Sequence, residues 1–415
     1  MSTWTEAQAK RGLPFSGQAV RVLGGLALAA LIYVGVRNQG HWQLLLVFGL
    51  LFGFILQRGR FCFASAFRDL FLLGEARVMK GILAGLAVAT VGFTLVMYTF
   101  SPTIMAGRYI ATANILPLGF HTLLAGVVFA IGMSLAGGCI SGNLYRIGEG
   151  YVASAVALLG IFIGLLLLGY TWDFWWTASV SYSPKIWFPQ SMGYVGSMLL
   201  TLLLVGISFI ALLWWESRSR RHGIPIREAA AVESPGLGGQ VRAMASRVFV
   251  DSWPVVTAGV LLGGLNTALF LLHHPWGVTG ALYQMADAAA TPLGLSPGTL
   301  TGLASLGGAC NVGSERGEAF GLSHDSMIVG GMVLGSFVAA SGAGEFKIRV
   351  PRQKRRLLQA LIGGILMGYA SALALGCTLG AFFSAVPSLA LNGWLFAVGL
   401  LGGSYVGVKI LRRLA

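Results

Sequence analysis

Apolar residues occur along this chain in long stretches that are separated by short polar segments. A helix needs roughly 20 apolar residues to cross the hydrocarbon core of a bilayer, and about ten stretches approach that length. They cover residues 20–36, 42–57, 81–100, 118–137, 151–170, 192–215, 254–272, 325–344, 357–376 and 391–410. The pattern therefore predicts an all-α polytopic membrane protein with about ten transmembrane helices.

Other segments are apolar but too short, or too often broken by glycine and proline, to cross a bilayer. Irregular backbone at membrane depth is tolerated only where it is buried in protein or lines a water-filled cavity. We therefore expect about four short re-entrant helices between the spans. They cover residues 60–71, 140–147, 275–285 and 378–387.

The order of these elements repeats along the chain. Each unit has a span, a short segment, two spans, a second short segment and a last span. The first unit begins outside and the second inside, so the pattern predicts an inverted internal repeat, in which transporters hold substrate near the membrane midplane. The expected division is a tail and anchor helix (1–41), a first repeat (42–191), a connecting helix with a basic linker (192–253) and a second repeat (254–415).

Basic residues gather in the loops that this arrangement places on one side of the membrane. An excess of lysine and arginine marks the cytoplasmic side, so we expect both termini to be cytoplasmic. The loop at 216–252 is polar and too short to bury a core, which predicts a linker. Four tryptophans fall on the opposite side as an expected aromatic belt: Trp172, Trp175, Trp176 and Trp187.

The composition supports a membrane protein and argues against other classes. The chain is 56% hydrophobic and 10% charged, against about 25% charged residues in soluble domains. The net charge of +14 resides mostly in loops, so we expect no nucleic-acid partner. The four cysteines form neither a C-x-x-C pair nor a Cys/His cluster, so no disulfide framework, metal site or cofactor is predicted.

Two of the cysteines occupy copies of one pattern, Leu-x-x-Gly-Cys-x-x-Gly, at residues 135–142 and 373–380. Each copy closes an apolar helix that carries a glycine thirteen residues before the cysteine, Gly126 or Gly364. A single free cysteine is usually just a small buried apolar residue. The repeated pattern instead favours a functional role for Cys139 and Cys377.

The glycine before each of these thiols, Gly138 or Gly376, lets the backbone turn and lets a ligand approach the sulfur closely. We therefore expect both glycines and both cysteines to contact a substrate.

A third thiol, Cys62, lies in a segment with three arginines, Arg58, Arg60 and Arg68. Intramembrane charges usually mark function, and an arginine that faces the pore would favour anions. The alternative is that the arginines anchor a cytoplasmic helix end, with Asp69 as a local partner. Both interpretations stay open here. Within this segment we expect Cys62, Arg60 and Ser65 to contact substrate.

The same question applies to Arg146, seven residues after Cys139. Thr279, in the thiol-free counterpart of the Cys62 segment, is a further candidate for substrate contact, although a structural turn is equally compatible with that segment.

We expect Cys62, Cys139 and Cys377 to lie staggered along a central path, and three thiols along the path restrict the kind of substrate that it can carry. A thiol is a weak donor and soft acceptor, whereas sulfate and phosphate oxygens prefer arginine and backbone amides. A small anion with an exposed terminal sulfur, thiosulfate above all, can bind thiols through that sulfur and arginine or backbone amides through its oxygens. Several weak sites in series let an ion leave as readily as it enters.

The segments 58–69 and 135–142, with 349–364 leading into 376–384, resemble the YeeE/YedE family of sulfur-compound transporters. The resemblance covers most of the chain from about residue 42 and implies uptake of thiosulfate, or of a related sulfur or selenium species, across the bacterial inner membrane. It also implies a substrate relay through Cys62, Cys139 and Cys377, and a small cytoplasmic sulfur-carrier protein as partner. Cys310 lies outside the matched pattern, so we treat it as a packing residue with its role open.

Other classes fit less well. A membrane thiol oxidoreductase, the alternative from another class, would need a vicinal or C-x-x-C cysteine pair, and the sequence has neither. A metal transporter would need intramembrane acids or a histidine cluster, whereas His41, His273 and His274 fall at outer helix ends and His121 near one. We therefore expect a transporter and not an enzyme, and the absence of a Walker motif argues against ATP hydrolysis in this chain.

Overall fold

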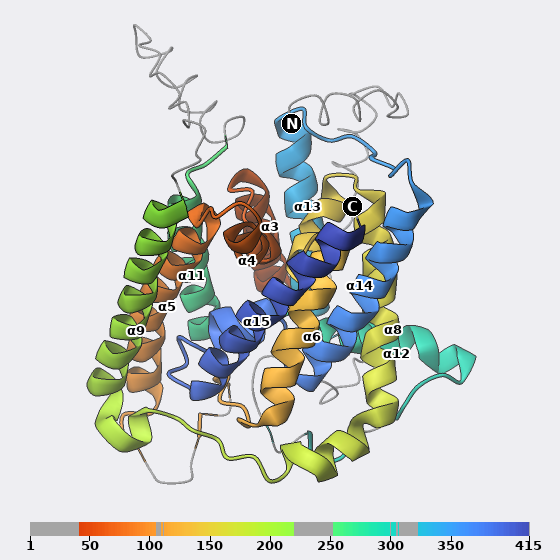
Figure 1. The fold of residues 1–415 in the computed structure, drawn as a ribbon. Helices are drawn as coiled ribbons and strands as arrows, with labels where there is room; N and C mark the ends of the chain where they lie inside the picture. Colours follow the sequence, from red (N-terminus) through yellow and green to blue (C-terminus); the bar gives the residue numbers. More distant parts are fainter. Residues whose placement is uncertain are drawn as a thin grey trace, which may run out of the picture.

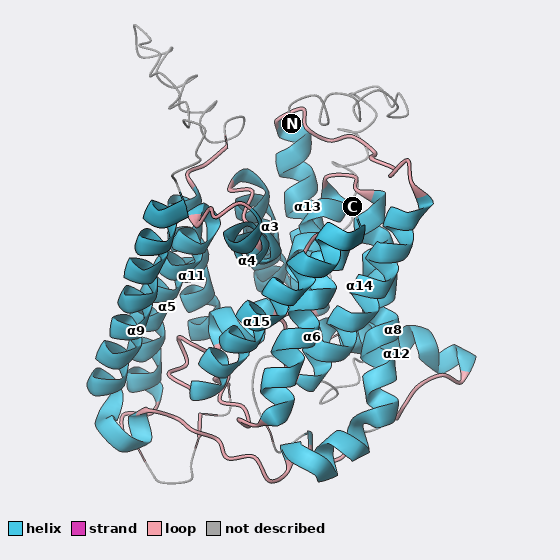
Figure 2. Ribbon diagram, viewed as in Figure 1, coloured by secondary structure: helices cyan, strands magenta, loops and turns pink. Residues whose placement is uncertain are grey.

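The computed structural model describes residues 41–104, 109–110, 112–219, 252–298, 300–303, 306 and 323–414. The predicted first span, most of the central linker and Cys310 lie outside these residues. The described part is built of helices and loops (Figure 2), and its β-structure is confined to two isolated bridges. The all-α fold class is thus confirmed.

Nine longer helices form the bundle in the described part (Figure 1). They are α3 (His41–Arg58), α5 (Arg77–Phe100), α6 (Phe120–Ala136), α8 (Val152–Trp175), α9 (Pro189–Ser219), α11 (Val255–Leu272), α13 (Ser326–Gly342), α14 (Lys354–Leu373) and α15 (Leu391–Leu414). Eight helical segments are long and apolar enough to cross a membrane, and α13, with 17 residues, is shorter. The multi-pass character is thus confirmed over the described residues.

All four short segments are helical, as the sequence predicts. They are α4 (Phe63–Leu72), α7 (Ile140–Gly148), α12 (Thr279–Ala290) and η5, a π-helix (Thr378–Ser384). The predicted start of α12 at residue 275 is wrong by four residues. Trp276 N there donates to Asn266 Oδ1 (2.8 Å), and Trp276 O accepts from Ser384 Oγ (2.8 Å). The polar groups of this connector are therefore satisfied by neighbouring elements before the helix begins.

Other differences occur at helix ends. The helices α5 and α14 begin three to four residues before the apolar stretches that predicted them, because their first turns contain Arg77, Lys80, Lys354 and Arg355. Similarly, α9 continues to Ser219, into the expected linker, and α8 continues as a π-turn, η1 (Trp176–Val180). Apolar length underestimates a helix whose end lies in water.

The main helix contacts join one half of the chain to the other. The helix α3 packs against α13 while α5 packs against α11, and α8 packs against α14 while α6 packs against α15. If each helix is replaced by its counterpart in the other predicted repeat, the contact between α3 and α13 becomes that between α11 and α5. In the same way, the contact between α8 and α14 becomes that between α15 and α6. The inverted repeat remains a prediction, and this pairing supports it.

Glycines carry these contacts. A Cβ at Gly126 would lie 2.7 Å from Phe396 O and 2.9 Å from the Cα of Gly399. A Cβ at Gly364 would lie 2.2 Å from Ala157 O and 3.1 Å from the Cα of Gly160. The two glycines that precede the cysteine patterns thus make the same backbone contact in each half, as close membrane packing requires.

The helix α9 lies at the edge of the bundle, beside α5 (Figure 1). Large apolar side chains along its length stay exposed, among them Val195, Leu199, Leu203 and Ile210. A soluble protein rarely exposes such a continuous apolar face, so this surface fits contact with lipid.

Candidate functional site

Two of the cysteines form a buried pair. Cys62 is the residue before α4 and Cys139 the residue before α7. A Cβ at Gly142 would lie 2.9 Å from Cys62 Sγ and 3.3 Å from Cys139 Sγ. Both thiols are free and buried, so two short helices present their N-terminal thiols to one place.

The loop before α7 is held in shape by its own residues. Gly137 has a φ of +77°, in the left-handed region that favours glycine. Asn143 Nδ2 donates to the carbonyls of Gly138 and Cys139, at 3.0 Å each. Gly142 N donates to Cys139 Sγ (3.3 Å). The sequence interpretation did not identify Asn143, although its place one turn after the cysteine is the available signal.

Ser141 also contacts the Cys139 thiol, with its hydroxyl 3.3 Å from the sulfur. Cys139 Sγ therefore has two polar neighbours, an amide N–H and a hydroxyl. Because the sulfur accepts from the Gly142 amide, the thiol meets a soft, negatively charged partner as a donor through its S–H group.

The third thiol, Cys377, lies at the start of η5 and is fully buried. The Thr279 hydroxyl lies beside its sulfur. The buried side-chain atoms without a hydrogen-bond partner in the described part include Thr279 Oγ1, Thr378 Oγ1 and Trp276 Nε1. Because buried polar atoms are normally hydrogen-bonded, these groups are suited to bind a polar ligand.

Gly376 supports the turn before Cys377. A Cβ at this position would lie 2.7 Å from Ala381 N, so any larger residue would push the start of η5 away from the turn. The expected close approach of backbone at Gly376 is therefore present, and its contact is with protein.

Aromatic rings link the segments that carry the two thiol sites. Phe63, next to Cys62, contacts Phe383 of η5 edge to face, with ring centroids 5.5 Å apart. The Trp276 ring stacks on that of Phe52, with ring centroids 3.7 Å apart, and meets the Phe383 ring edge to face, with centroids 6.4 Å apart. Phe63 and Phe383 lie in the segments that carry the family resemblance, but their contact with each other joins residues far apart in the sequence, so no local pattern predicted it.

A cavity of about 570 Å³ opens beside the thiol pair. Cys62, Ser65 and Arg146 line it, together with charged residues from the loops at that end of the bundle. The other lining residues are Arg60, Tyr145, Glu149, Tyr151, Gly344, Glu345, Lys347 and Arg349. Ser65 Oγ donates to Cys62 O (2.8 Å), which ties its hydroxyl to the backbone of the thiol segment.

The arginines of the Cys62 segment have different environments. Arg58 is buried and pairs with Glu345 at 3.0 Å, whereas Arg60 is 69% exposed and pairs with the same carboxylate at 3.1 Å. Arg68 pairs with Asp69 at 2.8 Å, so Asp69 is a local partner, as the anchoring alternative expected. The partner Glu345 lies 287 residues from Arg58, beyond the reach of sequence patterns.

The charges around Glu345 affect its ionisation. Burial opposes the charge of this carboxylate, but a hydrogen bond from Gln57 and the charges of Arg58 and Arg60 lower its pKa below the usual range. Glu345 is thus ionised at neutral pH and holds the end of α3.

Arg146 differs from the other three arginines in its position. Its Nη1 donates to Gly137 O, and a Cβ at Gly138 would lie 3.3 Å from the same nitrogen. The guanidinium therefore adjoins the turn that carries Cys139, and the side chain also lines the cavity. It brings a positive charge close to the thiol pair.

The family model described as sulphur transport matches residues 58–406. The chain belongs to this family. The YeeE/YedE resemblance is thus confirmed, and membership makes the chain a transporter and not an enzyme.

Relatives from two bacteria extend the comparison. The thiosulfate transporter TsuA of Spirochaeta thermophila is 29% identical over 379 residues, which cover 90% of this chain and 99% of that protein. The thiosulfate transporter TsuA of Escherichia coli is 26% identical over 363 residues, covering 86% and 91%. The probable transporter YedE of Escherichia coli is 34% identical over 189 residues, covering 45% and 44%.

Proposed function

We propose that this member of the sulphur transport family takes up thiosulfate across the bacterial inner membrane. The observation that carries the proposal is the arrangement of three free, buried thiols in two places. Cys377 adjoins Thr279, and the pair Cys62 and Cys139 adjoins a cavity that reaches the charged loops. Relatives that cover nearly the whole chain are named thiosulfate transporters.

The ion passes from Cys377 to the pair. At Cys377 its terminal sulfur accepts a hydrogen bond from the thiol, while the hydroxyls of Thr279 and Thr378 and the indole N–H of Trp276 donate to its oxygens. At the pair, the two thiols contact the terminal sulfur and Arg146 balances the charge of the anion. The thiols act only as hydrogen-bond donors, so no covalent bond to the substrate forms or breaks.

Release occurs through the cavity beside Cys62. Its lining includes Arg60, Lys347 and Arg349, opposed by Glu149 and Glu345. More positive than negative side chains attract the anion out of the thiol pair, and their exposure to water keeps each contact weak enough for departure. Gly138 and Gly376 shape the turns that carry two of the thiols.

The arrangement at the membrane follows the distribution of basic residues. The cavity end carries Lys347, Arg349 and the C-terminal arginines of α15, so this end faces the cytoplasm in the proposal. A small sulfur-carrier protein would receive the cargo there, and both termini lie on that side. Reporter fusions at either terminus test the orientation, which is refuted if a reporter is active outside the membrane.

The experiment is uptake of sulfur-labelled thiosulfate by cells that lack their own sulfur-uptake routes. Cys139→Ala and Cys377→Ala should each abolish most uptake while the protein remains folded in the membrane. Cys310→Ala is the matched cysteine control and should retain uptake. If both variants transport normally, the relay is wrong.

A selenium compound is the second candidate cargo, since selenium shares the soft character of sulfur. Competition by unlabelled selenium oxyanions in the same assay separates the two. If a well-expressed wild-type chain takes up no thiosulfate, thiosulfate is excluded as cargo and the selenium candidate takes its place.

A further inference from the structure

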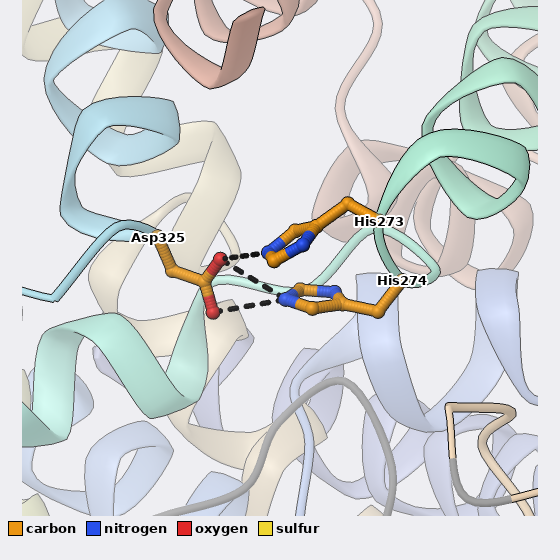
Figure 3. A group of neighbouring side chains, drawn as sticks. All are labelled: His273, His274 and Asp325. Atoms are coloured by element: carbon orange, nitrogen blue, oxygen red, sulfur yellow. Dashed lines mark hydrogen bonds and ion pairs between the residues drawn. The ribbon is translucent and has the colours of Figure 1, made fainter. Parts of the chain in front are cut away.

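Three titratable side chains outside the thiol sites meet at the other end of the bundle. His273 and His274 follow α11, and Asp325 directly precedes α13 (Figure 3). Asp325 Oδ1 lies 3.1 Å from His273 Nε2 and 3.0 Å from His274 Nε2, and Oδ2 lies 3.0 Å from His274 Nε2. Ligand-type atoms of all three residues lie within 4.8 Å of one another.

The position of this cluster follows from neighbouring helices. At the start of α3 the ring of Trp42 contacts that of His324, beside Asp325, at 4.8 Å. At the end of α3, Arg58 reaches Glu345, just beyond α13. The two helices therefore run in parallel, and the length of α13 places the cluster roughly 25 Å from the cavity end.

The backbone fixes the tautomer of His274. Its Nδ1 lies 2.9 Å from Pro275 O, and a carbonyl oxygen only accepts, so Nδ1 carries a proton. In the neutral ring, Nε2 is then an unprotonated acceptor that points at a carboxylate, which is also only an acceptor. Either a second proton on the ring, which gives an imidazolium–carboxylate pair, or a metal cation between the two groups resolves this contact. Metal-bound histidines commonly donate their other ring N–H to a backbone carbonyl, as His274 does here.

The three side chains suit a divalent ion of the zinc class. Two imidazoles and one carboxylate are a frequent donor set for such ions, which accept water at the remaining positions. The side chains of His273, His274 and Asp325 are 29%, 15% and 23% exposed. They are therefore ordered by the fold and open to an ion from solution.

We propose that His273, His274 and Asp325 bind a divalent ion of the zinc class. The ion joins the connector before α12 to the start of α13. That connector also holds Trp276, whose ring stacks on Phe52, and it leads to Thr279 beside Cys377. The metal site therefore positions one wall of the Cys377 site, and its existence does not depend on which anion is transported.

The test measures zinc binding to the full chain, purified in detergent without a histidine tag and stripped with a chelator. Competition with a chromophoric chelator gives the affinity and the number of ions per chain. We expect one ion at the wild-type site, with affinity reduced at least about tenfold in His274→Asn and Asp325→Asn. The matched control is His324→Asn, a neighbouring histidine on Trp42, which should bind like wild type.

Thermal unfolding gives a second readout. An ion that binds the folded state raises Tm with concentration, so zinc should raise the Tm of wild type and His324→Asn but not that of His274→Asn. His273→Asn alters the more exposed of the two histidines and serves if His274→Asn does not fold. Equal zinc binding in all variants, or no saturable binding to wild type, overturns the proposal.

Discussion

Replacing Gly142 with alanine tests the thiol pair without removing either thiol. The new Cβ would lie 2.9 Å from Cys62 Sγ and 3.3 Å from Cys139 Sγ. Nonbonded heavy atoms normally keep about 3.5–4.0 Å, so the methyl group is about 0.6–1.1 Å too close to the nearer sulfur. Either the Cys62 side chain or the start of α7 must move, and the space between the sulfurs is lost.

The size of the effect follows from overpacking. Inserting a methyl group into a packed site costs about 1–3 kcal/mol, partly offset by roughly 1 kcal/mol of better helix propensity for alanine. If the substrate must occupy the space between the sulfurs, a penalty of about 1–3 kcal/mol on the bound state lowers uptake roughly 5- to 150-fold. The assay is labelled thiosulfate uptake at low concentration, normalised to folded protein.

Two further variants separate function from folding. Gly402→Ala is the matched control, because a Cβ there meets nothing within 4 Å, and it should transport like wild type. Gly142→Ala combined with Cys62→Ala removes the closer of the two contacts, so it should recover part of the lost thermal stability but not uptake. Wild-type uptake by Gly142→Ala would refute the adjacency of the thiols in the transport path.

Three other outcomes are expected. Gly364→Ala should lower stability by about 1–3 kcal/mol, because its Cβ would lie 2.2 Å from Ala157 O; a Tm equal to that of Gly402→Ala would contradict the packing. Arg58→Gln should destabilise by about 1.5–3 kcal/mol, because a buried guanidinium that donates to the partly exposed Glu345 is lost. Arg60→Gln, 69% exposed on the same carboxylate, should destabilise by at most about 1 kcal/mol. Equal effects on urea unfolding would refute this contrast. The pKa of Glu345 is lowered in the fold, so the ionised carboxylate stabilises the protein above the usual glutamate pKa of about 4.3, and this contribution is lost as the pH falls below that value towards the lowered pKa. Glu345→Gln should therefore lack this acid-dependent part of the Tm profile. A profile identical to that of wild type would contradict the lowered pKa of Glu345.

The two matched patterns around Cys139 and Cys377 were predictable because a helix end, a turn and a cap are local features. The sequence also predicted all four short helices, since glycine and proline mark their borders. Their bounds depend on tertiary contacts: α12 begins only where Asn266 and Ser384 no longer bind the connector. Those two partners come from other helices, so no local pattern contains them.

The charged residues illustrate the same division. The sequence left open whether Arg58, Arg60 and Arg68 face a pore, and for Arg58 and Arg60 the answer depended on an acid that it could not pair with them. Arg68 has a neighbour in sequence, Asp69, whereas Arg58 and Arg60 meet Glu345 only after α3 and α13 have packed. Asp325 and the two histidines were likewise separate in the sequence and meet through the same packing.

The amino-acid sequence alone determined that the chain is a helical membrane protein with repeated thiol patterns, because the length of an apolar run and the spacing within a turn are properties of neighbouring residues. Only the tertiary structure decided which thiols face each other, which cation lies beside them and which side chains line the cavity. Those choices depend on how helices from different parts of the chain approach through their glycines, and close packing admits few such arrangements.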